Sequence, residues 1–317
     1  MKAMVIENFG GQEQLHFEDL PTPMPADNEV QIEIYYTAVN PVDWKIREGM
    51  LKGLMLHEFP LILGWDAAGI VTAAGKNVKN LKKGDAVFAY CRKKIVKWGT
   101  YAEYICVDAA HVALKPASLS YAQAASIPLV GLTAWQALFD FAKLKSGETI
   151  LIHAGAGGVG SLAIEFAHQI GAKIITTASE EHHAYVKKLG ADIAIDYHKD
   201  NVNDKIRKLY PDGIDVVLDC VGGQTLRDSY ATLKPNGRIV SIVEQVDPEL
   251  CKKHRVKGGF VFVSPNGKQL TEIADLISAG KIVSPHIEEM PLSAAAAAQE
   301  KIKQGHTQGK IVLKVKR

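Results

Sequence analysis

A cluster of four glycines in the stretch AGAGGVG, residues 154–160, has the spacing of a phosphate-binding turn. Gly155, Gly157 and Gly160 satisfy the pattern G-x-G-x-x-G, which follows the apolar run TILIH and precedes a segment with apolar residues at helical spacing. In that context the first glycine allows a tight turn, the second lets the backbone approach a pyrophosphate, and the third lets helix and strand pack closely. The alternative is a purely structural turn. The context favours a dinucleotide site, with contacts at Gly155, Gly157, Gly158, Val159 and Gly160.

The segment TTASEEHH, residues 176–183, bears on which dinucleotide is bound. An acidic residue about 20 positions after the glycines binds the ribose 2′-hydroxyl of NAD and repels a 2′-phosphate. Ser179 stands 19 positions after Gly160, and its hydroxyl can donate to a phosphate. We therefore expect NADPH, with NADH the less favoured alternative, although Glu180 and Glu181 follow and the segment holds no Lys or Arg.

The elements that must position these residues alternate between strand-like and helix-like runs after about residue 122. Apolar β-type runs are expected at 149–153, 173–178, 193–196, 215–221, 238–243 and 256–263, with helical segments between them. Six strands separated by helices predict an α/β fold with a doubly wound parallel sheet, the Rossmann arrangement. The predicted dinucleotide-binding domain spans residues 123–264.

The first part of the chain has a different texture. Residues 1–122 hold short β-type runs separated by proline and glycine, which predicts a β-rich domain. Residues 265–317 contain two helical segments and a last strand, KIVLKVK. This tail is too short for a core of its own, so we assign it to the first domain.

Composition excludes several classes of function. With 37 Lys and Arg against 35 Asp and Glu, the chain has no large field of either sign, so we expect no nucleic-acid partner. Its apolar runs are too short for a spanning helix, and its first residues lack a signal-peptide core, so we expect no membrane partner. Four widely separated cysteines fit a reduced, cytoplasmic setting.

An ordered series of short motifs gives the chain a family resemblance. The series includes NPVDWKIREG (40–49), PLILGWDAAGIV (60–71), KKGDAVFA (82–89), AASIPLVGLTAWQAL (124–138), AGAGGVG, IDY (195–197), LDCVGG (218–223) and LKPNGRIVSI (233–242). Together, in this order, they resemble the medium-chain dehydrogenase/reductase superfamily, in its zinc-independent quinone oxidoreductase and enone reductase branch. That resemblance implies a GroES-like β-barrel catalytic domain, interrupted by the Rossmann domain, with the active site in the cleft between them.

Departures from the zinc alcohol dehydrogenases of this superfamily indicate a reaction without metal. The positions of their cysteine and histidine zinc ligands fall on Asn40 and Trp65, and their proton-relay residue falls on Val42. Neither an amide nor an indole replaces a thiolate or an imidazole, so we expect no zinc or other metal. Without a Lewis acid an alkoxide is not stabilised, whereas a quinone or an α,β-unsaturated carbonyl (an enone or enal) is already electrophilic enough to accept hydride.

The resemblance also carries over residue by residue. It places Asn40 and Thr133 near the nicotinamide, and Tyr197 beside the adenosine 2′-phosphate, where His182 replaces a lysine of some relatives. Strand-end contacts to the cofactor are implied at Val221, Ser241, Phe262 and Val263. Lys45 borders the implied cleft and is our candidate for polarising the acceptor oxygen, with an exposed helical lysine as the alternative reading. The edge strand GGFVFV predicts a homodimer, since family members pair such strands across a two-fold axis.

Two other functions stay open at this point. An atypical alcohol dehydrogenase would use the same cofactor on a different substrate. A non-enzymatic NADPH-binding protein, like the crystallins of this branch, would bind the cofactor without turnover.

Overall fold

The structure, a computed structural model, describes residues 1–305 and 307–316. These residues form two compact units, one of Met1–Leu129 with the tail from Ser264 onwards, the other of Val130–Val263. The first boundary falls after residue 129 rather than 122, because helix α2 (Tyr121–Ala125) packs against strands of the first unit. His306 and Arg317, which the sequence assigns to the first domain, lie outside the described residues.

The second unit is built on one parallel sheet. Its strands lie in the order β13 (Ile193–Ile195), β12 (Lys173–Thr177), β11 (Thr149–Ile152), β14 (Ile214–Asp219), β15 (Leu233–Ser241) and β16 (Lys257–Phe260). Every neighbouring pair is parallel. The central strands are apolar runs buried on both faces, as a helix-covered parallel sheet requires. This confirms the predicted six-stranded Rossmann sheet, in the order 3-2-1-4-5-6.

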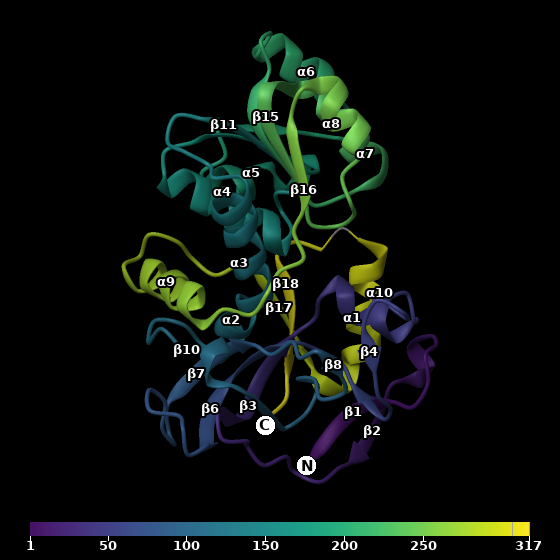
Figure 1. Cartoon of the computed structure of the whole chain (residues 1–317), viewed down its shortest axis with the longest axis vertical. Helices are drawn as coiled ribbons and strands as arrows, with labels where there is room; N and C mark the ends of the chain where they lie inside the picture. The colour runs from purple at the N-terminus through teal and green to yellow at the C-terminus, as the bar shows by residue number, and fades with distance from the viewer. Residues whose placement is uncertain (306, 317) are drawn as a thin grey trace. The chain divides into compact units, whose positions relative to one another are not determined.

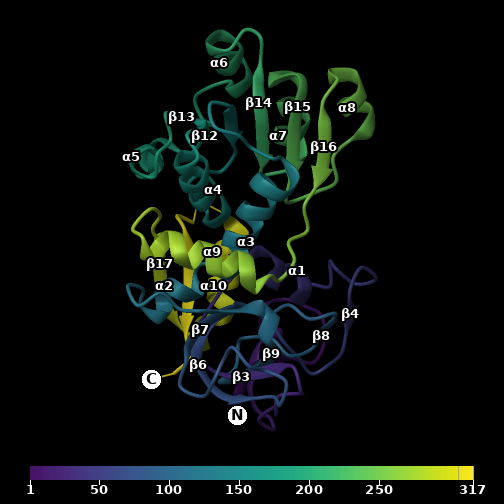
Figure 2. The same ribbon diagram turned by 60° about the vertical axis from the view of Figure 1, so that its left-hand side comes forward.

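Helices connect these strands and cover the sheet. They are α3 (Pro128–Trp135), which continues as a π-helical turn (Gln136–Phe141), α4 (Gly158–Gln169), α5 (His183–Lys188), α6 (Val202–Leu209), α7 (Gly223–Ser229) and α8 (Pro248–His254). Helix α4 buries an apolar stripe that includes Leu162 and Phe166. Figure 2 shows α5 beside the β12–β13 end of the sheet and α8 beside the β16 end. Single turns of 3₁₀ helix lie at Glu180–His182 and Tyr230–Thr232.

The first unit is centred on the long strand β3 (Glu29–Ala38). It pairs along one edge with β6 (Asp66–Ala74), and its other edge is shared by β9 (Tyr104–Asp108) and the C-terminal strand β18 (Lys310–Lys314). The sheet continues through β7 (Ala86–Tyr90) and β10 (Val112–Leu114) on one side and β17 (Ile287–Pro291) on the other. Val30, Ile32 and Ile34 alternate along β3 and point into one apolar core.

Smaller elements complete this unit. Strands β1 (Lys2–Ile6), β2 (His16–Asp19) and β5 (Leu61–Ile62) form one sheet, and β4 (Leu56–His57) with β8 (Ile95–Val96) another. The helices are α1 (Pro41–Arg47), α2, α9 (Gly267–Ser278) and α10 (Ala295–Gln304), with 3₁₀ turns at Gln12–Gln14, Ala109–His111 and Leu292–Ala294.

Within the first unit, the buried Arg47 joins α1 to the C-terminal helix α10. Figure 1 shows α1 beside α10. Between them Arg47 donates from Nη1 to Gln299 over 2.8 Å and from Nη2 to Glu300 over 2.6 Å. A fully buried guanidinium needs such partners. Within the described chain no helix is both long and apolar enough to cross a membrane.

Candidate functional site

The glycine turn begins directly after β11 and leads into α4. Gly157 is the N-cap residue, and the helix begins at Gly158, so its first backbone N–H groups have no partner within the helix. Below the turn, Gly155 N–H donates to the Thr177 carbonyl over 2.9 Å and Ala154 N–H to the Thr177 hydroxyl over 3.0 Å. Hydrogen bonds to Thr177 of β12 therefore hold the turn in place. The first N–H groups of α4 remain available as donors at the positive end of the helix dipole.

Two glycines of the pattern, Gly157 and Gly160, differ in the space around them. A Cβ on Gly160 would lie only 2.7 Å from the Gly155 Cα and would also overlap the Ala154 backbone. A Cβ on Gly157 would meet only the Ala154 carbonyl oxygen, at 3.3 Å. Packing thus requires a glycine at 160, whereas the space beside 157 is open, as a phosphate approaching the backbone requires.

A second turn lies at the carboxyl end of the neighbouring strand β14. Buried Asp219 accepts hydrogen bonds from the N–H groups of Val221 (3.1 Å) and Gly222 (2.9 Å), and from the Ser241 hydroxyl (2.7 Å). Val221 is left 49% exposed on this turn. Strands β11 and β14 are where the strand order reverses, which is where such sheets bind ligands at their carboxyl ends.

The sequence did not single out Asp219. Its signal was present, because an acidic residue at the end of an apolar strand and before two glycines is typical of a turn that a carboxylate holds. Of the other predicted strand-end contacts, Ser241 is fully buried and donates to Asp219, Val263 is buried and Phe262 is 45% exposed. Thr133 is buried on α3.

Polar residues follow the outer strands β12 and β13. The Ser179 hydroxyl lies 2.8 Å from His182 Nδ1, and Tyr197 is 45% exposed after β13. The structure adds a residue that the sequence did not single out, Lys199, whose ammonium donates to the Glu180 carboxylate. The sequence pattern missed it because the two residues are 19 positions apart and only the pairing of β12 with β13 brings them together.

His153, directly after β11, is a structural residue of this unit. It is buried, with Nε2 2.9 Å from the Ser229 hydroxyl and Nδ1 3.3 Å from the Thr177 hydroxyl. Burial lowers its pKa to about 4. A neutral imidazole therefore ties β11 to β12 and α7.

The first unit holds a buried polar network around Asn40, which precedes α1. Lys310, on β18, donates to the Asn40 side-chain oxygen and, over 2.8 Å, to the Val39 carbonyl. Asn40 Nδ2 donates to Asp66 over 2.8 Å, and the Lys310 ammonium lies 3.7 Å from the same carboxylate oxygen. All these side chains are 4% exposed or less. The amide of Asn40 is thus fixed at both ends by residues from β6 and β18.

A second carboxylate, Asp43, completes this network. Its Oδ2 accepts from the Asn40 N–H over 2.8 Å and from the Tyr101 hydroxyl over 2.9 Å, while its Oδ1 has no hydrogen-bond partner. Burial raises the pKa of Asp43 to about 7. Burial also raises the pKa of Asp66 and lowers that of Lys310, and the attraction between the two opposes both changes.

Lys45 lies on α1 and is not part of this network. Its ammonium stands 5.8 Å from the centre of the Trp44 ring, a cation–π distance. Val42, the next predicted departure from the zinc enzymes, is half-buried on the same helix.

Comparison with known proteins agrees with both units. The model of the alcohol dehydrogenase GroES-like domain matches residues 26–117, and that of the zinc-binding dehydrogenase family matches residues 189–313. The NADPH-dependent alkenal/one oxidoreductase of Arabidopsis thaliana chloroplasts is 37% identical over 99% of this chain and 79% of its own length. The chain belongs to the quinone oxidoreductase branch of the medium-chain dehydrogenase/reductase superfamily.

Solved structures of this branch have the same fold. The quinone oxidoreductase of Coxiella burnetii is 36% identical, covers 100% of this chain and 99% of its own, and gives a TM-score of 0.89. The Escherichia coli quinone oxidoreductase complexed with NADPH is 28% identical, covers 99% of this chain and 100% of its own, and gives a TM-score of 0.88. The predicted fold, a Rossmann domain with a GroES-like domain, is thereby confirmed.

Zinc does not fit the positions where other members of the superfamily bind it. Asn40 has both ends of its amide engaged, and Trp65 is a buried indole that offers no metal donor. The Asp66 carboxylate next to them already has a positive charge beside it, the Lys310 ammonium. A lysine from β18 thus supplies the cation of this region.

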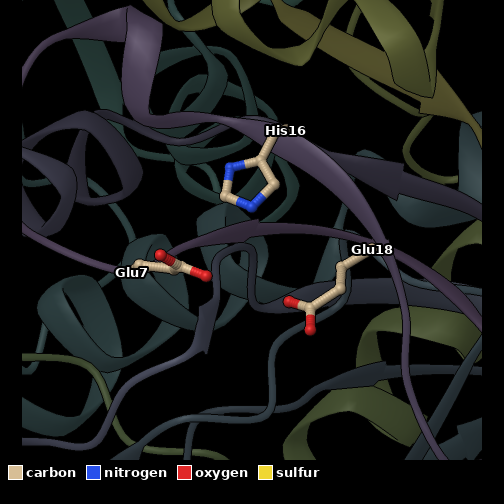
Figure 3. Close-up of side chains that lie close together, drawn as sticks. All are labelled: Glu7, His16 and Glu18. Atoms are coloured by element: carbon tan, nitrogen blue, oxygen red, sulfur yellow. The ribbon is translucent and has the colours of Figure 1, made fainter.

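A group of possible metal ligands lies elsewhere, on the β1–β2 hairpin. Figure 3 shows the imidazole of His16 facing the carboxylates of Glu7 and Glu18. The possible ligand atoms of these three residues all lie within 4.8 Å of one another. His16 Nδ1 donates to the Gln14 carbonyl over 3.0 Å. Two of the three residues are exposed, and exposed acidic groups commonly gather without an ion. The group shares no residue with the buried network.

Proposed function

We propose that this chain is an NADPH-dependent reductase that transfers hydride to a quinone or to an α,β-unsaturated carbonyl. The observation that carries the proposal is the open glycine turn at the reversal of strand order in the second unit. The names of its relatives, an NADPH-dependent alkenal/one oxidoreductase and quinone oxidoreductases, support the same substrate class.

The residues of the second unit fit a dinucleotide. The first N–H groups of α4, a helix of 12 residues, have no partner within the helix and would hold a pyrophosphate beside Gly157. The turn that Asp219 holds presents Val221 at the adjacent strand end. When bound, the cofactor supplies hydride from C4 of its nicotinamide. The protein's part is to orient the acceptor and to exclude water.

The remaining predicted site residues stay proposals. We assign Thr133 and Asn40 to the nicotinamide region, and Tyr197, Ser179 and His182 to the adenosine 2′-phosphate. Lys45 stays the candidate for polarising the acceptor oxygen. A quinone or enone needs no metal for this reaction, because conjugation already makes its reacting carbon electrophilic. We therefore propose a zinc-independent reaction, which the donor set around Asn40 supports.

We also propose a cytoplasmic homodimer that acts on small molecules, without a nucleic-acid or membrane partner. Strand β16 is the edge of the parallel sheet, and the ring of its last residue, Phe260, stacks on that of Phe262 just beyond the strand. Such an edge can pair with its two-fold copy and continue the sheet. Four free cysteines suit a reducing compartment. Light scattering should give about twice the 34.5 kDa chain mass, and a monomer mass would reject the dimer.

A panel of acceptors tests the substrate class. NADPH oxidation is followed at 340 nm with quinones, alkenals, enones and simple ketones, with NADH in parallel. We expect turnover of the conjugated acceptors and little or none of the simple ketones. Cofactor binding without turnover of any acceptor would instead favour a non-enzymatic NADPH-binding protein. Turnover confined to simple ketones would favour an alcohol dehydrogenase.

A further inference from the structure

A lysine outside the predicted site lies at the edge where the adenosine end of the cofactor is expected. Ser179 and Glu180 follow β12, and Lys199 follows β13. These strands are parallel neighbours, so their carboxyl ends lie together. The Lys199 ammonium donates to the Glu180 carboxylate, and the Asp196 carboxylate lies 4.0 Å from the same nitrogen.

The ion pair of Lys199 with Glu180 changes the charge of the segment after β12, which is acidic by itself. Glu180 stands 20 residues after Gly160, the position from which an acidic side chain binds the ribose 2′-hydroxyl of NADH and repels the 2′-phosphate of NADPH. Residues 179–183 hold a second acid, Glu181, and no Lys or Arg. Lys199 therefore brings to this edge the permanent positive charge that the segment lacks.

We propose that Lys199 is the residue that selects NADPH over NADH, by neutralising Glu180 and by donating to the adenosine 2′-phosphate. The Ser179 hydroxyl, 2.8 Å from His182 Nδ1 and 3.3 Å from Glu181 Oε1, is the second donor at this edge. The inference rests on the proposed function, since it deepens the cofactor assignment of the same site.

The chemistry of the side chain suits the role. The Lys199 side chain is 63% exposed and its ammonium has three N–H donors, so it can keep its bond to Glu180 and also donate to a phosphate that carries nearly two charges. Exposure also limits the effect, because water and salt screen charges there. We expect a contribution to 2′-phosphate affinity of about tenfold, as for a charge-assisted hydrogen bond in a solvated site.

The test compares two ligands that differ only in the 2′-phosphate. Calorimetric titration of the full chain with 2′,5′-ADP (adenosine 2′,5′-bisphosphate) and with 5′-AMP measures the preference without turnover. In Lys199→Met the affinity for 2′,5′-ADP should fall about tenfold, and that for 5′-AMP should stay within about twofold. Lys199→Arg should keep the preference, because the guanidinium also donates to phosphate.

Lys234→Met is the matched control. Lys234 is also an exposed lysine of the second unit paired with a carboxylate, Asp215, but both stand at the amino ends of their strands. The same loss of charge there should leave both affinities unchanged. As a second readout, rising salt should weaken the binding of 2′,5′-ADP more than that of 5′-AMP in the native protein, and this difference should shrink in Lys199→Met.

The outcomes separate the inference from the function on which it rests. A native protein that binds neither ligand would overturn both. A native protein that prefers 2′,5′-ADP, with the preference retained in Lys199→Met, would overturn the role of Lys199 and leave the dinucleotide site standing. Equal losses for the two ligands in Lys199→Met would also overturn it, since they would indicate a structural role.

Discussion

Gly157→Ala separates the folding role of the glycine turn from its binding role. The backbone at Gly157 has φ −77° and ψ 174°, an extended conformation that alanine adopts without strain. The new Cβ meets one protein atom, the Ala154 carbonyl oxygen at 3.3 Å, which must move by a few tenths of an ångström. With alanine a poorer N-cap than glycine, we expect a loss of unfolding free energy of at most about 1 kcal/mol.

Cofactor binding should respond far more strongly. The added carbon occupies the open space through which the pyrophosphate would reach the N–H groups at the start of α4. Losing one charge-assisted hydrogen bond costs about 1.5–3 kcal/mol, which corresponds to a rise of about 10- to 150-fold in Kd for NADPH.

Two measurements on the same variants test this reasoning. Urea unfolding gives the stability, and the quenching of tryptophan fluorescence by NADPH gives the Kd. Gly160→Ala is the control, because its Cβ would overlap the backbone of Ala154 and Gly155 and should destabilise the second unit by several kcal/mol. Native NADPH affinity in a folded Gly157→Ala would refute the assignment of this turn as the pyrophosphate site.

Two further predictions concern the buried network of the first unit. Lys310→Met leaves the Asp66 carboxylate buried without its cation and should lower the free energy of unfolding, measured by thermal unfolding, by about 3–5 kcal/mol. Adding Asp66→Asn should restore part of that loss. The control is Lys301→Met, which breaks an exposed ion pair and should cost no more than about 1 kcal/mol. A loss as small as that of the control would contradict the network. Burial raises the pKa of Asp43 to about 7, so its carboxyl keeps its proton more readily in the folded state than in the unfolded state. Its contribution to the free energy of unfolding is therefore full below about pH 4 and is lost as pH rises towards 7. Asp43→Asn should therefore gain stability relative to the native protein over that range, by at most about 1.4 kcal/mol per pH unit, and parallel stability curves would show that Asp43 does not titrate there.

The sequence predicted well those elements whose signal is local. The strands of the second unit are short apolar runs between helices, and the glycine spacing identified the turn after β11. The C-terminal helices and strand β18 were also expected from residues 268–316. Strand β17 escaped as a strand, because Ile287–Pro291 is partly exposed and rich in glutamate, so it lacks the apolar alternation that marks a strand.

The contacts of Lys310 and Lys199 are long-range, and the sequence alone could not predict them. Lys310 bonds to Asn40 although 270 positions separate them, because β18 pairs with the end of β3 that leads to Asn40. Lys199 meets Glu180 through the pairing of β12 with β13. Neither lysine stands in a motif, and each is placed by sheet topology alone. The sequence showed that Asn40 and Trp65 replace the zinc ligands of other superfamily members. It did not show that Lys310 supplies a positive charge beside them.

The position of the transferred hydrogen tests the central claim most directly. The protein is supplied with NADPH carrying deuterium at C4 of the nicotinamide, on the face that is transferred, together with an acyclic enone, and the product is analysed by NMR. Direct hydride transfer to a conjugated acceptor predicts one deuterium at the β-carbon of a saturated ketone, with the α-hydrogen taken from solvent. Deuterium on the carbinol carbon of an allylic alcohol would contradict the account, because it would show reduction of the carbonyl group itself.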